Sequence, residues 1–500
     1  MIRNILFSFA GQILTFIVAL LALPITVRAY GVTNYGIIAL VITTLGASAI
    51  LDLGLSRTTT KFVAERLAQQ NASGVIDIIW SSTMLQYAIG LLLGIVGAIL
   101  LPFLVAMVDV KVLASADAKA FVLIIAATLP FTLAAGSLRG ALEGAQRFAL
   151  VSWVKALQNC SIYLLPAICG LAHASVLHAT IWLCVSRVVV FLLYLLVCAS
   201  VFPSFWRFRL SRIFSNFSFW RYSGWLAVSN LVVAFHINAD RFLIALWAGV
   251  AAVGYYAIPM EIVNGLSVIA GSITGVLMPA FSSLHAQPDK CATAQPVFFR
   301  GVRWVLLLLI PIVTILSIDG QPLIAMWQGD LIAANTNLPL KVALIALLVN
   351  ALGWVPTALA LGFGRVDIVV KLQIAQVPII LVSAWLLIPA YGATGAAMTF
   401  LIRVVFETTA LYLATDKVLL PRSFKRGAAI VRFDKIALLG LLGVPLYIAS
   451  ALMVSRGAMG ANILCYALIY TGCWWIAVAD TTEKKAIKGF VVLRHARVFP

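Results

Sequence analysis

Uncharged, apolar stretches of roughly 20 residues recur along the whole chain, and they limit the possible folds more than any other feature. A helix needs about 20 residues to cross the roughly 30 Å of hydrocarbon in a bilayer. Backbone groups in lipid must be hydrogen-bonded within their own segment, so each stretch predicts a membrane-spanning helix. Composition agrees, because 63% of the 500 residues are hydrophobic, only 10% are charged and the mean hydropathy is +1.06. The sequence therefore predicts an all-α polytopic membrane protein.

The apolar pattern predicts about 14 spans. The first run, Ile5 to Val27, is longer than a signal-peptide core and lacks its small-residue exit, so we interpret it as a retained span. The longest predicted connections are each about 20 residues, too short for a domain of their own. The predicted spans are 5–27, 35–55, 80–104, 120–138, 156–172, 176–200, 222–247, 252–279, 303–318, 341–361, 369–389, 393–414, 435–454 and 459–479.

The distribution of basic residues predicts the orientation. If the N-terminus is cytoplasmic, most of the 35 lysines and arginines fall in cytoplasmic segments, and the positive-inside rule then puts both termini in the cytoplasm. The net charge of +18 is spread over many short loops, which indicates topology and attraction to anionic lipid headgroups rather than nucleic-acid binding. Three arginines remain inside predicted spans: Arg187, Arg241 and Arg403.

Cysteine and phosphate-loop patterns point to no further chemistry. The seven cysteines lie mostly within apolar spans without metal-ligand spacing, so we expect buried thiols, and we expect no cofactor. The chain contains no GxxxxGK[ST] motif, so it does not hydrolyse ATP by that route.

An internal repeat is the most informative pattern. Two pairs of blocks match at one offset of 218 residues, the distance from Gly31 to Gly249, and a third pair carries Arg187 and Arg403 with a slip of two. The offset covers six predicted spans, an even number, so the halves share one orientation and relate by an axis along the membrane normal. The paired blocks are GVTNYGIIAL (31–40) with GVAAVGYYAI (249–258), GAQR (144–147) with GFGR (362–365), and SRVVV (186–190) with IRVVF (402–406).

The repeat predicts the domain organisation. Spans 1–6 form an N-lobe over residues 1–205, and spans 7–12 form a C-lobe over residues 206–420. Residues 421–500 add two peripheral helices and a basic cytoplasmic tail. A substrate site would lie between the two lobes.

With 14 helices arranged as 6+6+2, the chain resembles the Wzx-type polysaccharide flippases of the MOP superfamily. The residues that carry the resemblance are GVTNYGIIAL…LDLGLSRTTTKFVAE (31–65), NADRFLIALWAGVAAVGYYAIP (238–259), MPAFSSL (278–284) and GATGAAMTFLIRVVFE (392–407). The resemblance implies that an undecaprenyl-pyrophosphate-linked oligosaccharide moves from the cytoplasmic to the periplasmic leaflet of the bacterial inner membrane, by alternating access around a cationic cavity. The product would be O-antigen, capsule or exopolysaccharide.

Two related transporter classes share this architecture and remain alternatives, the multidrug and toxin extrusion transporters and the lipid II flippase. A membrane glycosyltransferase or polymerase is a third alternative, but the largest predicted periplasmic connection offers only Asp319 and Asp330. The resemblance also names a polysaccharide polymerase and a chain-length regulator as candidate partners.

Arg187 and Arg403 are candidate substrate-binding residues. Each lies about ten residues into its span and therefore near mid-membrane at 1.5 Å per residue. A charge there is costly and usually faces a partner or a wet cavity, and guanidinium groups suit phosphate oxygens. The alternative for Arg403 is a local pair with Glu407, four residues later on the same helix.

Asp240 and Arg241 put an acid–base pair inside an apolar run. Adjacent helical residues point about 100° apart, so each needs another partner, and Glu261 is placed for contact with Arg241 across the hairpin. The contact could be purely structural, with Arg241 alternatively a substrate ligand. Protonation of Asp240 or Glu261 could instead couple ion flow to lobe movement, with His236 joining a relay.

Three further residues are candidates for gating or for contact with sugar rings. Asp52, near the cytoplasmic mouth of its span, is a candidate gating or capping residue. Tyr163 and Trp354 are candidates for stacking on sugar rings, but nothing in the sequence selects between them.

Overall fold

The computed structural model describes residues 2–48, 55–107, 116–203, 205–206, 239–285, 290–419, 466 and 469–470. Within these ranges nine helices are long and apolar enough to cross a membrane, which confirms a polytopic membrane protein. The predicted spans at 435–454 and 459–479 lie almost entirely outside the described residues, so the count of 14 stays a prediction. The elements are α1 (Ile2–Ser48), α2 (Leu55–Ala68), α3 (Ala72–Met107), α4 (Ala116–Gly144), α5 (Phe148–Leu171), α6 (Val176–Val201), α8 (Val250–His285), α9 (Lys290–Gln328), α10 (Asp330–Gly362), α11 (Val366–Ala414) and η2 (Thr415–Leu419).

The helices run further than the apolar runs, so two of the predicted connections are largely helical within the described residues. The segment 56–79 consists mostly of α2 and the start of α3, and within 319–340 only Gly329 separates α9 from α10. The 36 residues of α8 would span about 54 Å, well beyond the hydrocarbon thickness. Hydropathy marks where lipid ends, whereas the backbone hydrogen bonds of a helix continue into water.

Two helices each contain a pair of predicted spans joined at a glycine. The backbone leaves the helical region at Gly31 in α1 (φ 72°) and at Gly392 in α11 (φ 53°). Only a residue without a Cβ adopts such angles at little cost, so the chain can change direction there. A helical segment at 239–248 meets α8 at a third such residue, Gly249 (φ 83°).

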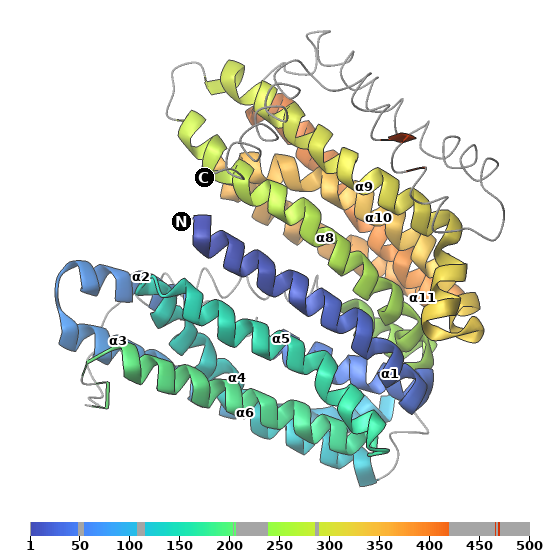
Figure 1. Cartoon of the computed structure of the whole chain (residues 1–500), viewed down its shortest axis with the longest axis horizontal. Coiled ribbons are helices and arrows are strands. Elements are labelled where there is room, and N and C mark those ends of the chain that lie inside the picture. The colour runs from blue at the N-terminus through green and yellow to red at the C-terminus, as the bar shows by residue number, and fades with distance from the viewer. Residues whose placement is uncertain are drawn as a thin grey trace, which may run out of the picture. The chain divides into compact units, whose positions relative to one another are not determined.

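The chain forms two compact units. The first contains Met1–Gly265, Ile324–Pro339 and Gln373–Phe400, and the second contains Leu266–Leu323, Leu340–Leu372 and Leu401–Pro500. In the first unit α1 to α6 form a bundle (Figure 1), in which α4 packs against α2, α3 and α6, and α5 packs against α1 and α6. The lobe boundaries at residues 205 and 420 stay predictions.

Apolar side chains fill this bundle. The larger core cluster joins α2 to α6 and includes Ile79, Leu138 and Tyr194, each at most 2% exposed. A second cluster packs Leu45 of α1 against Leu183 of α6. The α6 residues of both clusters lie on one face of the helix, and this is the face that packs against the neighbouring helices.

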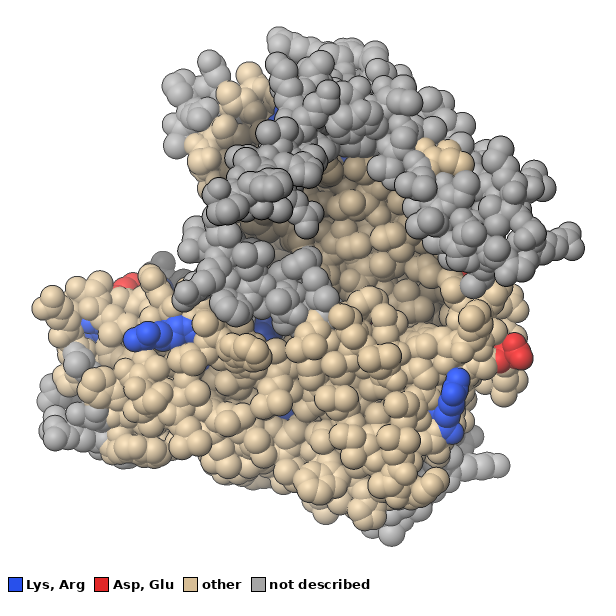
Figure 2. All heavy atoms as spheres, in the orientation of Figure 1, with Lys and Arg blue, Asp and Glu red and all other residues tan. Residues whose placement is uncertain are grey.

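The outer faces of the helices are also apolar, as a protein in lipid requires. On α6 the exposed side chains Val185, Val189, Leu192 and Leu196 recur every three to four residues, opposite the buried stripe. Few charged side chains interrupt the described surface that Figure 2 shows. Exposed apolar surface on this scale fits burial in hydrocarbon rather than in water.

The backbone has the same conformation at two turns that the internal repeat makes equivalent. Gln146 and Gly364 both have left-handed φ values, 57° and 71°. The next residues, Arg147 and Arg365, have nearly the same angles, φ −85° and −90°, and each donates its N–H to a carbonyl five residues earlier, at 2.9 and 2.8 Å. The turn between α4 and α5 is therefore built like the turn between α10 and α11.

Helix packing repeats at the same offset. In the first unit Gly144 of α4 lies against Thr60 and Val63 of α2. The residues 218 positions later make the same contacts in the second unit, where Gly362 of α10 lies against Met278 and Phe281 of α8. The structure thus supports the predicted internal two-fold repeat.

Candidate functional site

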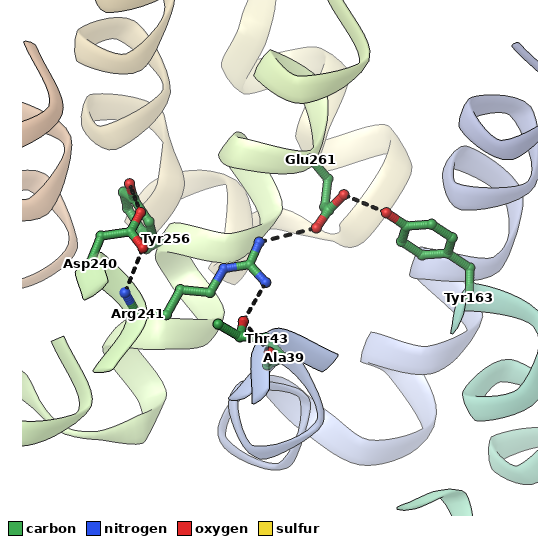
Figure 3. Close-up of polar contacts among 7 residues, drawn as sticks. All are labelled: Ala39, Thr43, Tyr163, Asp240, Arg241, Tyr256 and Glu261. Carbon is green, nitrogen blue, oxygen red and sulfur yellow. Dashed lines mark hydrogen bonds and ion pairs between the residues drawn. The ribbon is translucent and has the colours of Figure 1, made fainter. Parts of the chain in front are cut away.

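The intramembrane acid–base pair has separate partners, as the helical geometry predicted. The Tyr256 hydroxyl donates to Oδ2 of Asp240 at 2.6 Å, while Oδ1 accepts the backbone N–H of Arg241 at 2.8 Å. The guanidinium of Arg241 points away from Asp240 and towards Glu261 (Figure 3). Asp240 is therefore held by its own hairpin, and Arg241 is free to bridge elsewhere.

Glu261 of α8 is held from two sides. Arg241 Nη2 donates to Oε1 at 3.2 Å, which confirms the predicted contact across the hairpin. The Tyr163 hydroxyl of α5 donates to Oε2 at 2.7 Å. Arg241 also donates through Nη1 to Oγ1 of Thr43, at 3.0 Å. The four side chains form one chain of hydrogen bonds from α5 through α8 and segment 239–248 to α1 (Figure 3).

The residues of this hydrogen-bonded chain are mostly buried. The side chains of Arg241 and Glu261 are 14% and 15% exposed. Tyr35 of α1 is 4% exposed and lies within electrostatic range of both charges. Charge-assisted hydrogen bonds strengthen where the local dielectric is low, and a charge left there without a partner becomes expensive.

Next to this hydrogen-bonded chain, one face of α1 packs against one face of α8, and the internal repeat relates the two faces. A Cβ on Gly36 of α1 would overlap the carbonyl oxygen of Val250 of α8. Reciprocally, a Cβ on Gly254 would lie 2.5 Å from the carbonyl oxygen of Val32. Gly36 and Gly254 are 218 residues apart, as are Val32 and Val250, so the repeat makes the two contacts equivalent. We call Val32, Gly36, Ala39 and Thr43 the α1 stripe, and Val250, Gly254, Ala257 and Glu261 the α8 stripe.

The fourth positions of the stripes differ. Thr43 and Glu261 are equivalent by the repeat, and Arg241 binds both of them through its two terminal nitrogens. The repeat register was visible in the sequence and could have identified Thr43. Tyr163, considered only as a sugar-stacking residue, uses its hydroxyl to hold Glu261 instead.

Arg187 lies on the buried face of α6 and is 5% exposed. One turn away, Cys184 receives a hydrogen bond from Thr128 of α4 at 3.7 Å and packs in the cluster that contains Leu45. Within the described residues no acidic side chain lies within ion-pair distance of Arg187. A buried guanidinium without a local carboxylate is a candidate anion ligand.

Arg403 has the local partner that the sequence offered as the alternative. Its Nη1 lies 3.7 Å from Oε2 of Glu407, four residues later on α11, and both side chains are about one-fifth exposed. The pair is confirmed, and the substrate role of Arg403 stays a prediction. Two other candidates, Asp52 and His236, lie outside the described residues.

The sequence predicted no metal site and no disulfide. Across the described ranges no group of three His, Cys, Asp or Glu side chains could hold a metal ion. The described cysteines are free thiols, four of them buried: Cys160, Cys169, Cys184 and Cys198, with Cys291 partly buried.

Comparison with known proteins identifies relatives in both sequence and fold. The "Putative O-antigen transporter" of Shigella flexneri is 23% identical over 418 residues, which cover 82% of this chain and 96% of that protein. The solved structure of the lipid II flippase MurJ, in its inward closed conformation, superposes with a TM-score of 0.74 at 14% identity and covers 95% of this chain and 98% of its own. An inward-facing multidrug resistance MATE family transporter of the MOP superfamily superposes with a TM-score of 0.64 at 15% identity, covering 83% of this chain and 98% of its own.

The structural likenesses confirm the fold that the resemblance implied, that of the MOP superfamily transporters. The family model described as "Polysaccharide biosynthesis protein" matches residues 1–285, more than half of the chain and all of the residues in the hydrogen-bonded chain around Glu261. The repeat, the intramembrane charges and this match agree, and the protein belongs to the polysaccharide biosynthesis protein family.

Proposed function

We propose that the protein is a flippase that moves an undecaprenyl-pyrophosphate-linked oligosaccharide from the cytoplasmic to the periplasmic leaflet of a bacterial inner membrane. The observation that carries the proposal is the family match over residues 1–285 together with the two-fold repeat at an offset of 218. Parallel repeats are a design of alternating-access transporters, in which the site lies between the halves. The name of the Shigella flexneri relative, an O-antigen transporter, supports the same substrate class.

The substrate explains why arginines would be retained in the membrane. A diphosphate headgroup carries charge that hydrocarbon rejects, and guanidinium offers permanently charged, fork-shaped donors for its oxygens. Arg187 and Arg403 are the proposed ligands, one from each repeat. The absence of an acidic side chain beside Arg187 in the described ranges supports this role, whereas the Glu407 contact means that Arg403 would have to exchange partners.

Energy coupling is assigned to the intramembrane carboxylates. We place the coupling role on Asp240 and Glu261, because both are held by donors that a protonation would disturb. Protonating Glu261 would remove the charge that Arg241 compensates. Ion flow and rearrangement of the contacts between the repeats would then be linked at one residue.

Lipid II transport and multidrug export are the two alternative functions that the experiment described below distinguishes from the proposed one. The structural likeness to the lipid II flippase and to the multidrug transporter concerns the fold alone. The family match favours a polysaccharide precursor over either. Both termini are proposed to be cytoplasmic, with a polysaccharide polymerase and a chain-length regulator as partners in the same membrane.

Complementation tests the function directly. The wild-type chain should restore surface glycan in cells whose own flippase has been deleted, provided that the glycan matches. Arg187→Ala should lower surface glycan strongly, and Arg187→Lys should be intermediate because it keeps the charge but loses the fork. Arg365→Ala, at a helix turn where the arginine pairs with Asp367, is the matched control. Full activity of Arg187→Ala at normal abundance would remove Arg187 from the binding site, and export of drugs without restored glycan would reject the flippase.

A further inference from the structure

Tyr163 belongs to the first repeat and Glu261 to the second, so their hydrogen bond joins the two halves of the molecule. Arg241 makes a second connection of this kind, from segment 239–248 of the second repeat to Thr43 of α1. Glu261 is the common element, because one carboxylate oxygen faces each donor. All four residues lie within the first compact unit.

The hydrogen-bonded chain lies at one end of a close contact between the repeats. Along the α1 and α8 stripes, the positions before it are Val, Gly and Ala in both helices, which allows the backbones to approach closely. The side chains of Val, Gly and Ala carry no hydrogen-bonding group, so at these positions they contribute packing only. The polar chain at Thr43 and Glu261 supplies the directional bonds at one end of this contact.

We propose that Tyr163, Glu261, Arg241 and Thr43 form a latch that holds the α1 and α8 stripes together, and that Tyr163 is a positioning residue that keeps the Glu261 carboxylate aligned with Arg241. Transport by alternating access requires the repeats to separate here once in each cycle, and the latch must open for that. This inference rests on the proposed function in one respect only, namely that the separation of the repeats is a step of a transport cycle.

A second phenol in the same region offers a matched control. Tyr256 donates to Asp240 at 2.6 Å, nearly the same bond as the 2.7 Å bond from Tyr163 to Glu261. However, Tyr256 and Asp240 both belong to the second repeat, so their bond does not join the halves. Removing either hydroxyl deletes one phenol–carboxylate hydrogen bond, and only one of the two deletions weakens the proposed latch.

The test uses a cysteine in the contact as a reporter. Ala39 of the α1 stripe is 1% exposed, between Gly36 and Thr43, so an Ala39→Cys thiol should react slowly with a maleimide while the stripes are closed. The purified full-length protein is placed in nanodiscs, where both membrane faces are accessible, without substrate. Only the labelling that depends on the added cysteine is counted.

The proposal expects Tyr163→Phe to label about tenfold faster than the parent, because a hydrogen bond to a charged group is lost. Glu261→Gln should also label faster, since an amide cannot form the ion pair with Arg241. Tyr256→Phe should label at the parental rate. Parental rates in Tyr163→Phe and Glu261→Gln, or equal acceleration in Tyr163→Phe and Tyr256→Phe, would overturn the latch. Because no substrate is present, failed complementation beside the expected labelling pattern would reject the flippase and leave the latch intact.

Discussion

Removing the guanidinium of Arg241 should destabilise the protein far more than removing an arginine from an exposed pair. In an Arg241→Met variant the Glu261 side chain, 15% exposed, keeps its negative charge and loses its only described cationic contact. Breaking a buried ion pair by removing one partner costs about 3–5 kcal/mol, and the remaining exposure favours the lower end of that range. A loss of about 3 kcal/mol changes the ratio of folded to unfolded protein by roughly a hundredfold.

The matched control is Arg365→Met. Arg365 makes two hydrogen bonds to Asp367, at 2.9 and 3.1 Å, but both side chains are nearly half exposed. Exposed pairs contribute little to stability, so this variant should melt close to the parent despite the better hydrogen-bond geometry. The comparison separates the effect of burial from that of hydrogen-bond length, because the more buried pair, Arg241–Glu261, has the longer hydrogen bond.

Thermal unfolding in detergent, followed by tryptophan fluorescence, measures the difference. Arg241→Met should melt several degrees below Arg365→Met. Adding Glu261→Gln to Arg241→Met should recover part of the loss, because the uncompensated charge is removed along with its partner. Equal melting of the two single variants, or a double variant less stable than Arg241→Met, would refute the reasoning that an unpaired charge at Glu261 causes the loss.

Three further predictions concern the topology, the packing of α1 against α8 and the coupling carboxylates. Reporter tags at both termini should be cytoplasmic and a tag at Gly329, between α9 and α10, periplasmic; an external signal from either terminus would overturn the predicted topology. Gly254→Leu should abolish transport because the α1 backbone occupies the space of its side chain, whereas Gly275→Leu, with open space around it, should be tolerated; equal effects would contradict the close contact. Asp240→Asn or Glu261→Gln should flatten the pH dependence of transport if that carboxylate carries the coupling, and a wild-type pH profile in both would leave them structural.

The sequence predicts the contacts that are local or fixed by a hairpin. The Arg403–Glu407 pair follows from spacing on one helix, and the Arg241–Glu261 pair follows from depth on two helices joined by a short turn. The repeat register is equally readable, because matched residues such as Gly36 and Gly254 keep the same spacing in both halves.

Contacts between distant helices could not be predicted in the same way. Tyr163 is 98 residues from Glu261, and no periodicity reveals that α5 brings its hydroxyl to that carboxylate. An aromatic residue in a membrane span has many possible roles, and only the packing of α5 against α1 limits them. The burial of Arg187 is likewise a tertiary property, since span depth predicts its level in the membrane but not its side of the helix.

The reciprocal contact between Gly36 and Gly254 is of the kind that two identical subunits make across a two-fold axis, where each presents the same patch to the other. A six-helix ancestor could have paired with a second copy of itself through this surface. In such a dimer, positions 43 and 261 would have been the same residue, and two carboxylates or two hydroxyls would have faced each other. A single chain that carries both halves can have different residues at those positions, as it does at Thr43 and Glu261. An asymmetric bridge by the single Arg241 is therefore an arrangement that only such a chain can hold.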